Sequence, residues 1–187
     1  LEQATLQDDL TNLPNRRMIM RYLNSLMESR KLTLMSAGYD ARPCYPIKDD
    51  QPSLPYLAVV MVDIDFFKQV NDNYGHQVGD DVLIRFSKQM KEYLVNKGFC
   101  GRWGGEEFLI VLSEQNLEAA SQLLEDFKQQ VAGYHYDISP CIKLNLTISI
   151  GLTFCRYDDE SNSLINRSDK ALYCAKAQGR DCLVHLA

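Results

Sequence analysis

The sequence has no excess of basic residues, no paired-cysteine motif and no long apolar run, and each absence excludes a class of protein. Its 20 Lys and Arg against 25 Asp and Glu give a net charge of −5, which argues against a general nucleic-acid-binding surface. None of its six cysteines forms a Cys-x-x-Cys pair, so we expect free thiols in a reducing compartment and no zinc ribbon. It has no apolar run of about 18 residues and no signal peptide, so we expect this segment to make no membrane contact.

Length and composition favour one domain. The chain has 187 residues, 45% of them hydrophobic, which is enough for one substantial core. It starts at Leu1 without a methionine, within a predicted short helix that runs into a turn at Asp9–Asn15, and Asn15 is a candidate cap for the next helix. We therefore expect residues 1–8 to end a linker helix and residues 9–187 to form the domain. Four prolines within residues 33–55 predict a surface loop insertion there.

Apolar spacing predicts the order helix, strand, helix, hairpin, helix, strand, helix. Helical spacing indicates helices at 18–27, 82–94, 117–131 and 164–178. The continuous apolar run at 57–62 is typical of a strand buried on both faces, and a polar loop should follow through Gly79. Residues 99–112 suit a hairpin, and strict alternation at 142–154 predicts one half-buried strand. Together these elements predict an α+β fold with helices flanking a mainly antiparallel sheet.

Acidic residues occur where two predicted strands meet polar sequence. Asp63 and Asp65 end the first strand, and Glu106 and Glu107 follow the Gly104–Gly105 turn of the hairpin. If the hairpin pairs beside the first strand, Asp63 and one glutamate would converge at one sheet edge. Clustered carboxylates repel unless a cation joins them, and few hard oxygen ligands favour Mg²⁺ bound together with phosphate and water. The alternative for the two aspartates is a solvated strand end.

Three basic residues are candidates for phosphate contacts. Lys68 lies just beyond the first strand, and Lys176 and Arg180 are four residues apart at the end of the last predicted helix. That spacing places the last two on one helix face, and Arg180 is suited to bidentate phosphate contacts. The alternative is that both complement the dipole at the helix C-terminus.

Three polar residues are candidates for recognition of a base. Asn71, His76 and Asp80 lie in the predicted polar loop and at the start of the following helix. An aspartate can accept from the N1–H and N2–H₂ donors of guanine, and adenine offers no such donor pair. Turn and cap chemistry, which Asn and Asp favour, is the alternative.

Five blocks of sequence resemble the GGDEF-domain diguanylate cyclases, in the order of that family and over nearly the whole chain. The blocks are Asp9–Arg17, Val62–Asp72, Gly75–Asp80, Arg102–Phe108 and Asp169–Arg180. The family signature stands here as Gly-Gly-Glu-Glu-Phe, a variant found in active members. The resemblance implies a palm-like fold, shared with nucleotidyl cyclases and polymerases.

The resemblance also implies an activity: two GTP would be condensed to cyclic di-GMP with release of two pyrophosphates, by attack of each 3′-hydroxyl on the α-phosphate of the other GTP across a homodimer. One or two Mg²⁺ ions, with Mn²⁺ as an alternative, would bind Asp63, the Ile64 carbonyl and Glu106, and Glu106 would activate the hydroxyl. The resemblance implies that guanine is recognised by Asn71 and Asp80 and that His76 lines the substrate site. It also implies that the phosphates are bound by five residues: Phe66, Phe67, Lys68, Lys176 and Arg180. The segment is expected in the cytoplasm, by itself or within a larger, membrane-anchored protein.

One departure from the family pattern concerns control. Many members carry an Arg-x-x-Asp product-inhibition site shortly before the signature, but this chain has Val95–Gly98 there, without either charged residue. We therefore predict no product inhibition through that site. Two alternatives to the cyclase remain open: a catalytically degenerate GTP-binding signalling domain, and a nucleotidyltransferase that makes a mixed or adenine-containing product.

Overall fold

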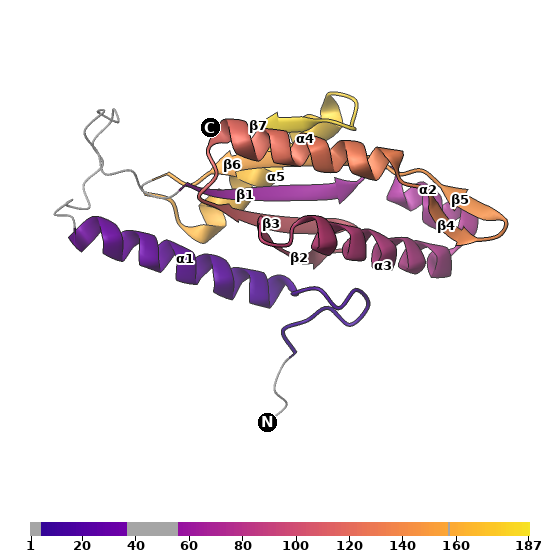
Figure 1. Ribbon diagram of the computed structural model, residues 1–187, viewed down its shortest axis with the longest axis horizontal. Helices are drawn as coiled ribbons and strands as arrows, with labels where there is room; N and C mark the ends of the chain where they lie inside the picture. The colour runs from indigo at the N-terminus through magenta and orange to yellow at the C-terminus, as the bar shows by residue number, and fades with distance from the viewer. Residues whose placement is uncertain (1–4, 37–55, 157) are drawn as a thin grey trace.

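The computed structural model describes residues 5–36, 56–156 and 158–187 (Figure 1). Along the chain the elements are α1 (Arg16–Ser36), β1 (Leu57–Ile64), α2 (Phe67–Tyr74), α3 (His76–Tyr93), β2 (Phe99–Gly104), β3 (Glu107–Ser113), α4 (Leu117–Gly133), β4 (Tyr136–Ser139), β5 (Ile142–Leu144), β6 (Ile148–Phe154), α5 (Ser161–Ala177) and β7 (Leu183–His185). A five-stranded sheet has the order β2-β3-β1-β6-β7 and is antiparallel except for the β6–β7 pair. The predicted α+β class is confirmed.

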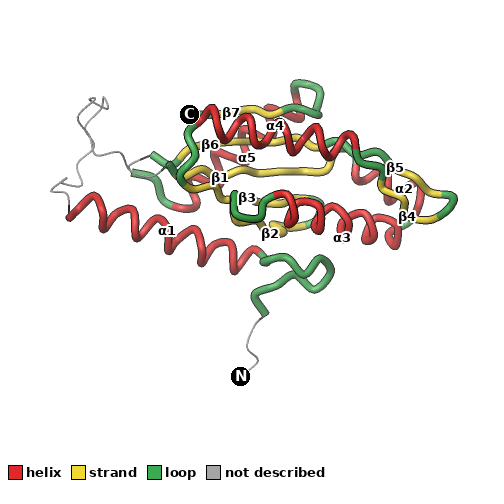
Figure 2. Tube along the Cα trace, viewed as in Figure 1, coloured by secondary structure: helices red, strands yellow, loops and turns green. Residues whose placement is uncertain are grey.

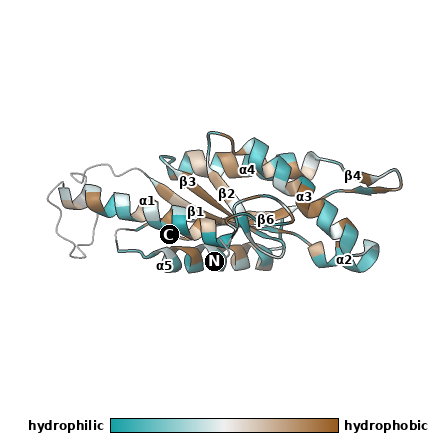
Figure 3. Ribbon diagram, turned by 90° about the horizontal axis from the view of Figure 1, so that it is seen from below, coloured by the Kyte–Doolittle hydropathy of each residue, from teal (hydrophilic) through white to brown (hydrophobic). Residues whose placement is uncertain are grey.

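Strand β1 is the centre of the sheet, and all eight of its residues are buried, as its continuous apolar run predicts. On one face, Val60 belongs to a core with Phe86 of α3 and Phe127 of α4. On the other face, Met61 belongs to a core with Leu172 of α5, to which α1 also contributes. Figure 3 shows the strands between α3 and α4 above and α5 below. Burial of each such side chain contributes about 1.5–3 kcal/mol, so the sheet is held from both sides.

Helix α5 lies directly against β6 because of one glycine. A Cβ atom added at Gly151 would lie 2.2 Å from the backbone nitrogen of Leu172 and 2.3 Å from the carbonyl oxygen of Ser168. No larger residue fits between that strand and that helix. This close approach explains why β6 is buried on both faces, and it corrects the prediction of a half-buried strand.

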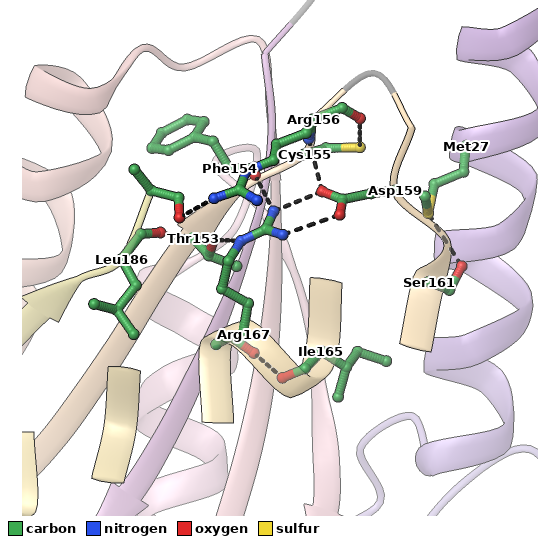
Figure 4. A network of polar contacts seen from close by, with 12 residues as sticks. Met27, Thr153, Phe154, Cys155, Arg156, Asp159, Ser161, Ile165, Arg167 and Leu186 are labelled. Atoms are coloured by element: carbon green, nitrogen blue, oxygen red, sulfur yellow. Dashed lines mark hydrogen bonds and ion pairs between the residues drawn. The ribbon is translucent and has the colours of Figure 1, made fainter. Parts of the chain in front are cut away.

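Arg167 of α5 joins that helix to the C-terminal end of β6 (Figure 4). Its guanidinium donates to both carboxylate oxygens of Asp159, to the Thr153 hydroxyl at 2.6 Å and to the Phe154 carbonyl at 2.7 Å. Burial opposes ionisation of Asp159, but hydrogen bonds from Arg167 and from the Arg156 backbone N–H outweigh it and lower the pKa of that carboxyl. This pair ties the first turns of α5 to the end of β6.

The chain before α1 is not helical in its described part, so the short helix predicted before residue 9 is wrong for residues 5–8, and the turn predicted at residues 9–15 is confirmed. Residues 5–15 form turns with a β-bridge between Gln7 and Pro14, visible as the loop before α1 in Figure 2. Asn15 caps the helix as predicted, because its side-chain oxygen accepts from the Met18 N–H at 3.1 Å. Residues 1–4 lie outside the described residues, and the domain boundary at residue 9 stays a prediction.

Helix α1 continues to Ser36, so it overlaps the start of the loop insertion that was predicted at residues 33–55. Residues 33–36 are therefore helical, and their hydroxyls bond back to the preceding turn: Thr33 donates to the Ser29 carbonyl and Ser36 to the Thr33 carbonyl. Residues 37–55 lie outside the described residues, so the rest of the insertion stays a prediction. No helix in the described part of the chain is both long and apolar enough to cross a membrane.

Two predicted segments have a different secondary structure. The predicted polar loop through Gly79 contains all of α2 and the start of α3, because Phe67 and Val70 are buried in the core and stabilise a helix that would not form alone. The predicted strand 142–154 is two strands, since β5 pairs with β4 in a separate hairpin and β6 begins only at Ile148. Strands β4 and β7, four and three residues long, were not predicted.

Candidate functional site

The pairing of β1 with β3 brings the acidic residues together. Asp63 is the direct partner of Glu107 in the antiparallel register, which places their side chains on the same face and about 5 Å apart at Cβ. Glu106 precedes Glu107, and its carbonyl accepts from the Ile64 N–H at 3.4 Å. The predicted convergence of Asp63 with a glutamate is confirmed, with both glutamates adjacent to it.

Asp63 is buried, and Lys176 of α5 reaches it. The Lys176 ammonium lies 2.7 Å from the Asp63 Oδ2 atom. Burial raises the pKa of Asp63 to about 6, against the lowering effect of Lys176, and the charges of Glu106 and Glu107 raise it further. Burial is also the largest cause of the raised pKa of Glu107. One ammonium therefore faces three carboxylates, and this group of side chains has the charge to attract a further cation.

The donor set is suited to a metal ion shared with a ligand. Among residues 5–36, 56–156 and 158–187, no three His, Cys, Asp or Glu side chains are grouped so that they could hold a metal ion. The carboxylates of Asp63 and Glu106 and the Ile64 carbonyl are hard oxygen donors, which Mg²⁺ prefers, and Mg²⁺ commonly takes the rest of its ligands from phosphate and water. These residues fit a Mg²⁺ ion that arrives with a phosphorylated ligand.

The Gly104–Gly105 turn leaves open space beside the acids. A Cβ atom added at either glycine would meet no other atom within 4 Å, and Gly105 has φ 53°. Arg102 stabilises the turn, because it donates to the Gly105 carbonyl from Nε at 2.9 Å and from Nη2 at 2.8 Å. The Arg102 Nη1 atom is also 3.0 Å from the Asp8 Oδ1 atom. A ligand can thus approach the backbone of a turn whose shape is fixed.

Asp8 and Arg102 are residues whose roles were not anticipated from the sequence. Burial opposes ionisation of Asp8, but hydrogen bonds from Thr11 and Arg102 outweigh it and lower the pKa of that carboxyl. The two residues are 94 positions apart. The only available signal was their position in the sequence: Asp8 directly precedes the block Asp9–Arg17, and Arg102 is the first residue of the block Arg102–Phe108.

The turn between β1 and α2 contains the predicted phosphate-binding residues. Phe66 has φ 58° and stands before α2 with no side chain capping the helix. Phe66 is 52% exposed, whereas Phe67 is buried in the core and Lys68 is exposed. The first N–H groups of an uncapped helix bind anions. Phe67 can therefore contribute only its backbone here, and Lys68 can contribute its charge.

Lys176 and Arg180 both approach this region, but not from one helix face as predicted. Helix α5 ends at Ala177, and Arg180 follows it with φ 67°. Lys176 contacts Asp63, and the Arg180 guanidinium carbon lies 4.8 Å from the centroid of the Phe66 ring. Lys176 therefore reaches the acids from the last turn of α5, and Arg180 reaches the start of α2 because the chain reverses after the helix.

The predicted base-recognition residues meet at the junction of α2 and α3. A Cβ atom added at Gly79 would lie 2.0 Å from the Asn71 Oδ1 atom, so the Asn71 amide lies against the start of α3, one residue before Asp80. His76 is the exposed first residue of α3, one turn before Asp80 on the same face. The structure brings these three residues together; their contacts with a ligand remain predictions.

Two surface hollows lie elsewhere. One of about 450 Å³ is lined by residues 96–99 together with Tyr22 and Glu114, and another of about 290 Å³ lies between α1 and the start of α5. Neither includes any of the predicted site residues. We place the candidate site at the acidic end of the sheet because its charges and open glycine turn, and not its depth, distinguish it.

Comparison with known proteins shows what the whole domain is similar to. Residues 48–182 match the family described as "Diguanylate cyclase, GGDEF domain". A curated relative, Diguanylate cyclase A of Treponema denticola, is 39% identical over 73% of this chain, and the match spans 37% of its own length. The solved diguanylate cyclase SiaD of Pseudomonas aeruginosa, in complex with its activator SiaC, is 34% identical with a TM-score of 0.78, over 99% of this chain and 63% of that one. The active GGEEF domain of a diguanylate cyclase from Vibrio cholerae is 29% identical with a TM-score of 0.66, over 89% of this chain and 96% of that one.

Proposed function

The chain belongs to the GGDEF family of diguanylate cyclase domains, and from that premise we propose that it condenses two GTP into cyclic di-GMP and two pyrophosphates. The observation that carries the proposal is the register of Asp63 with Glu107, beside Glu106 and an open Gly-Gly turn. The Vibrio cholerae relative is described as an active GGEEF domain, and the signature variant in this chain is the same. The variant is therefore compatible with activity.

The acidic residues would hold the metal. Asp63, Glu106 and the Ile64 carbonyl are the proposed ligands of Mg²⁺, with Mn²⁺ as the alternative. Bound there with the triphosphate, the ion would supply Lewis-acid stabilisation of charge on the phosphate oxygens. Lys176, 2.7 Å from Asp63, balances part of the acidic charge before substrate binds and can turn to a phosphate oxygen afterwards.

The remaining residues would bind and orient GTP. The N–H groups at the start of α2, Lys68 and Arg180 surround the same turn and would hold the phosphates. Asn71 and Asp80 would recognise guanine, with His76 beside them. This arrangement uses basic and polar groups from three separate segments, so one GTP would be fixed at both its base and its phosphates.

The reaction itself would need two copies of the chain. Each copy has one such set of residues, and each 3′-hydroxyl must reach the α-phosphate of the GTP on the other copy. Glu106 would accept the hydroxyl proton as the new O–P bond forms and the bond to pyrophosphate breaks. Sedimentation with and without GTP tests the homodimer, and a strictly monomeric, fully active protein would contradict it.

Replacing Glu106 by Gln tests the chemical role of that residue. The variant keeps the side-chain volume and removes the charge, so we expect the fold to survive while the rate of product formation falls by about 10²-fold or more. Glu92→Gln is the matched control, because Glu92 is an exposed glutamate of α3 that pairs with Lys88 of the same helix. Unchanged activity of Glu106→Gln would show that the assignment is wrong. A wild type that binds GTP tightly as a dimer and forms no product would favour a degenerate signalling domain.

A further inference from the structure

The turn that follows α5 has an unusual backbone. Gly179, Arg180 and Asp181 have φ values of 114°, 67° and 45°, three consecutive residues in a region that only glycine adopts readily. A non-glycine residue keeps such a conformation only where surrounding contacts over-determine it, and such residues gather at functional sites. The contacts that hold this turn therefore indicate what the turn is for.

Asp65 makes the central contact. Its Oδ2 atom accepts from the Asp181 backbone N–H at 3.0 Å and from the Thr147 hydroxyl at 2.7 Å, and its Oδ1 atom accepts from the Ser149 hydroxyl at 2.6 Å. The Asp65 N–H donates to the Thr147 carbonyl at 2.9 Å. Asp65 is only 4% exposed. Its carboxylate is thus fully engaged by the protein and is separate from the acidic cluster around Asp63.

A second contact holds the same turn from the other side. The Asp181 carboxylate lies 3.2 Å from the Lys128 ammonium, which extends from α4, and the Lys128 side chain is only 14% exposed. The Arg180 N–H donates to the Ala175 carbonyl at 3.1 Å. The turn is therefore attached to β6 and to the β1–α2 segment through Asp65, and to α4 through Lys128.

The two sides of the turn meet at Arg180. Asp65 directly precedes Phe66, and the Arg180 guanidinium lies over the Phe66 ring. One carboxylate thus fixes the segment that carries Phe66 and the segment that carries Arg180. We propose that Asp65 is a positioning residue that holds Arg180 above the start of α2, where it would contact the phosphates of GTP. The identity of the ligand rests on the proposed function; the contacts of Asp65 do not.

Removal of the acceptor oxygens tests this role. Asp65→Ala should weaken binding of a non-hydrolysable GTP analogue with Mg²⁺ by about tenfold, comparable to Arg180→Ala, since each change removes the charge-assisted phosphate contact. The double variant should bind no more weakly than Arg180→Ala alone. Asp65→Asn should restore most of the affinity, because its amide oxygen can accept from the Asp181 N–H and the Ser149 hydroxyl can rotate to accept from the amide.

Asp159→Ala is the matched control. It removes another buried carboxylate, at the far end of β6 (Figure 4), and should lower the melting temperature without changing the affinity for the analogue. Equal weakening by Asp159→Ala, or further weakening by Asp65→Ala in the Arg180→Ala background, would overturn the proposal. Calorimetry measures the affinity, and the single tryptophan, Trp103 beside the Gly104–Gly105 turn, gives an independent fluorescence signal.

A second variant keeps the test decisive if Asp65→Ala does not fold. Lys128→Met keeps the aliphatic packing and removes the ion pair with Asp181, so it should weaken analogue binding in the same direction, by about threefold. An unchanged affinity of that folded variant would overturn the proposal. Wild type that binds no GTP analogue would instead refute the proposed function, which separates the two failures.

Discussion

Replacing Gly79 by alanine should weaken recognition of guanine more than it weakens the fold. The new methyl group would lie 2.0 Å from the Asn71 Oδ1 atom, 3.1 Å from its Cγ and 3.3 Å from the Phe67 Cζ. The closest atom is the end of a partly exposed side chain, so the Asn71 amide can move away. Crowding costs about 1–3 kcal/mol, and the higher helix propensity of alanine offsets about 0.8–1 kcal/mol of it.

The displaced amide should lose the hydrogen bond to the base that we propose for it, which would be worth about 1–1.5 kcal/mol and corresponds to about a tenfold rise in the Kd for GTP. Titration of GTP with Mg²⁺ into each variant measures this effect, and thermal unfolding measures the change in the fold. Asn71→Ala should show the same loss, and the double variant should show no further loss. A Gly79→Ala protein with wild-type affinity, or one whose affinity loss adds to that of Asn71→Ala, would refute this reasoning.

Three further outcomes are expected. Gly151→Ala should destabilise the protein by about 3 kcal/mol in urea unfolding, since the three atoms nearest to its methyl group would all be backbone atoms of α5, as close as 2.2 Å; a loss below that of Gly79→Ala would contradict the packing described. Asp159→Asn should lower the free energy of unfolding at neutral pH by about 3 kcal/mol, because Arg167 loses its buried partner. The pKa of Asp159 is lowered in the folded state from 3.8, so its contribution is present above that pH and is lost as the pH falls further; the gap between wild type and variant should therefore be constant from about pH 5 to 7 and narrow in acid. Added cyclic di-GMP should leave the initial rate unaffected, because Val95–Gly98 lacks both charged residues of the product site, and strong non-competitive inhibition would contradict that prediction.

The central strands and the acidic cluster could be predicted from the sequence because their signals are local. An apolar run that ends in Asp63 and a hairpin with Glu106 and Glu107 after its turn need only be paired for the acids to meet, and β1 and β3 pair in that way. Helix α2 could not be predicted in the same way. Its Asn71-Asp72-Asn73 stretch favours turns, and burial of other side chains of the helix against a distant core overrides that preference.

The contacts that hold the site were beyond sequence patterns for a different reason: they are long-range. Asp65 bonds to the backbone of Asp181 across 116 positions, and Arg102 bonds to Asp8 across 94. Alternation could place Asp63 and Asp65 on one side of a strand, and both face α5 and the turn after it. Alternation could not show that Asp63 faces the Lys176 ammonium and two glutamates, whereas the Asp65 carboxylate accepts hydrogen bonds from two hydroxyls and a backbone N–H.

The most direct test of the account is to incubate the protein with GTP, ATP and Mg²⁺ and to identify the products by mass. We predict cyclic di-GMP and pyrophosphate from GTP, no adenine-containing dinucleotide, and loss of the product in Glu106→Gln. A dimeric wild type that leaves bound GTP unreacted, or that joins adenine nucleotides instead, would contradict the claim that Asp63 and Glu106 with the guanine-recognition residues make this chain a diguanylate cyclase.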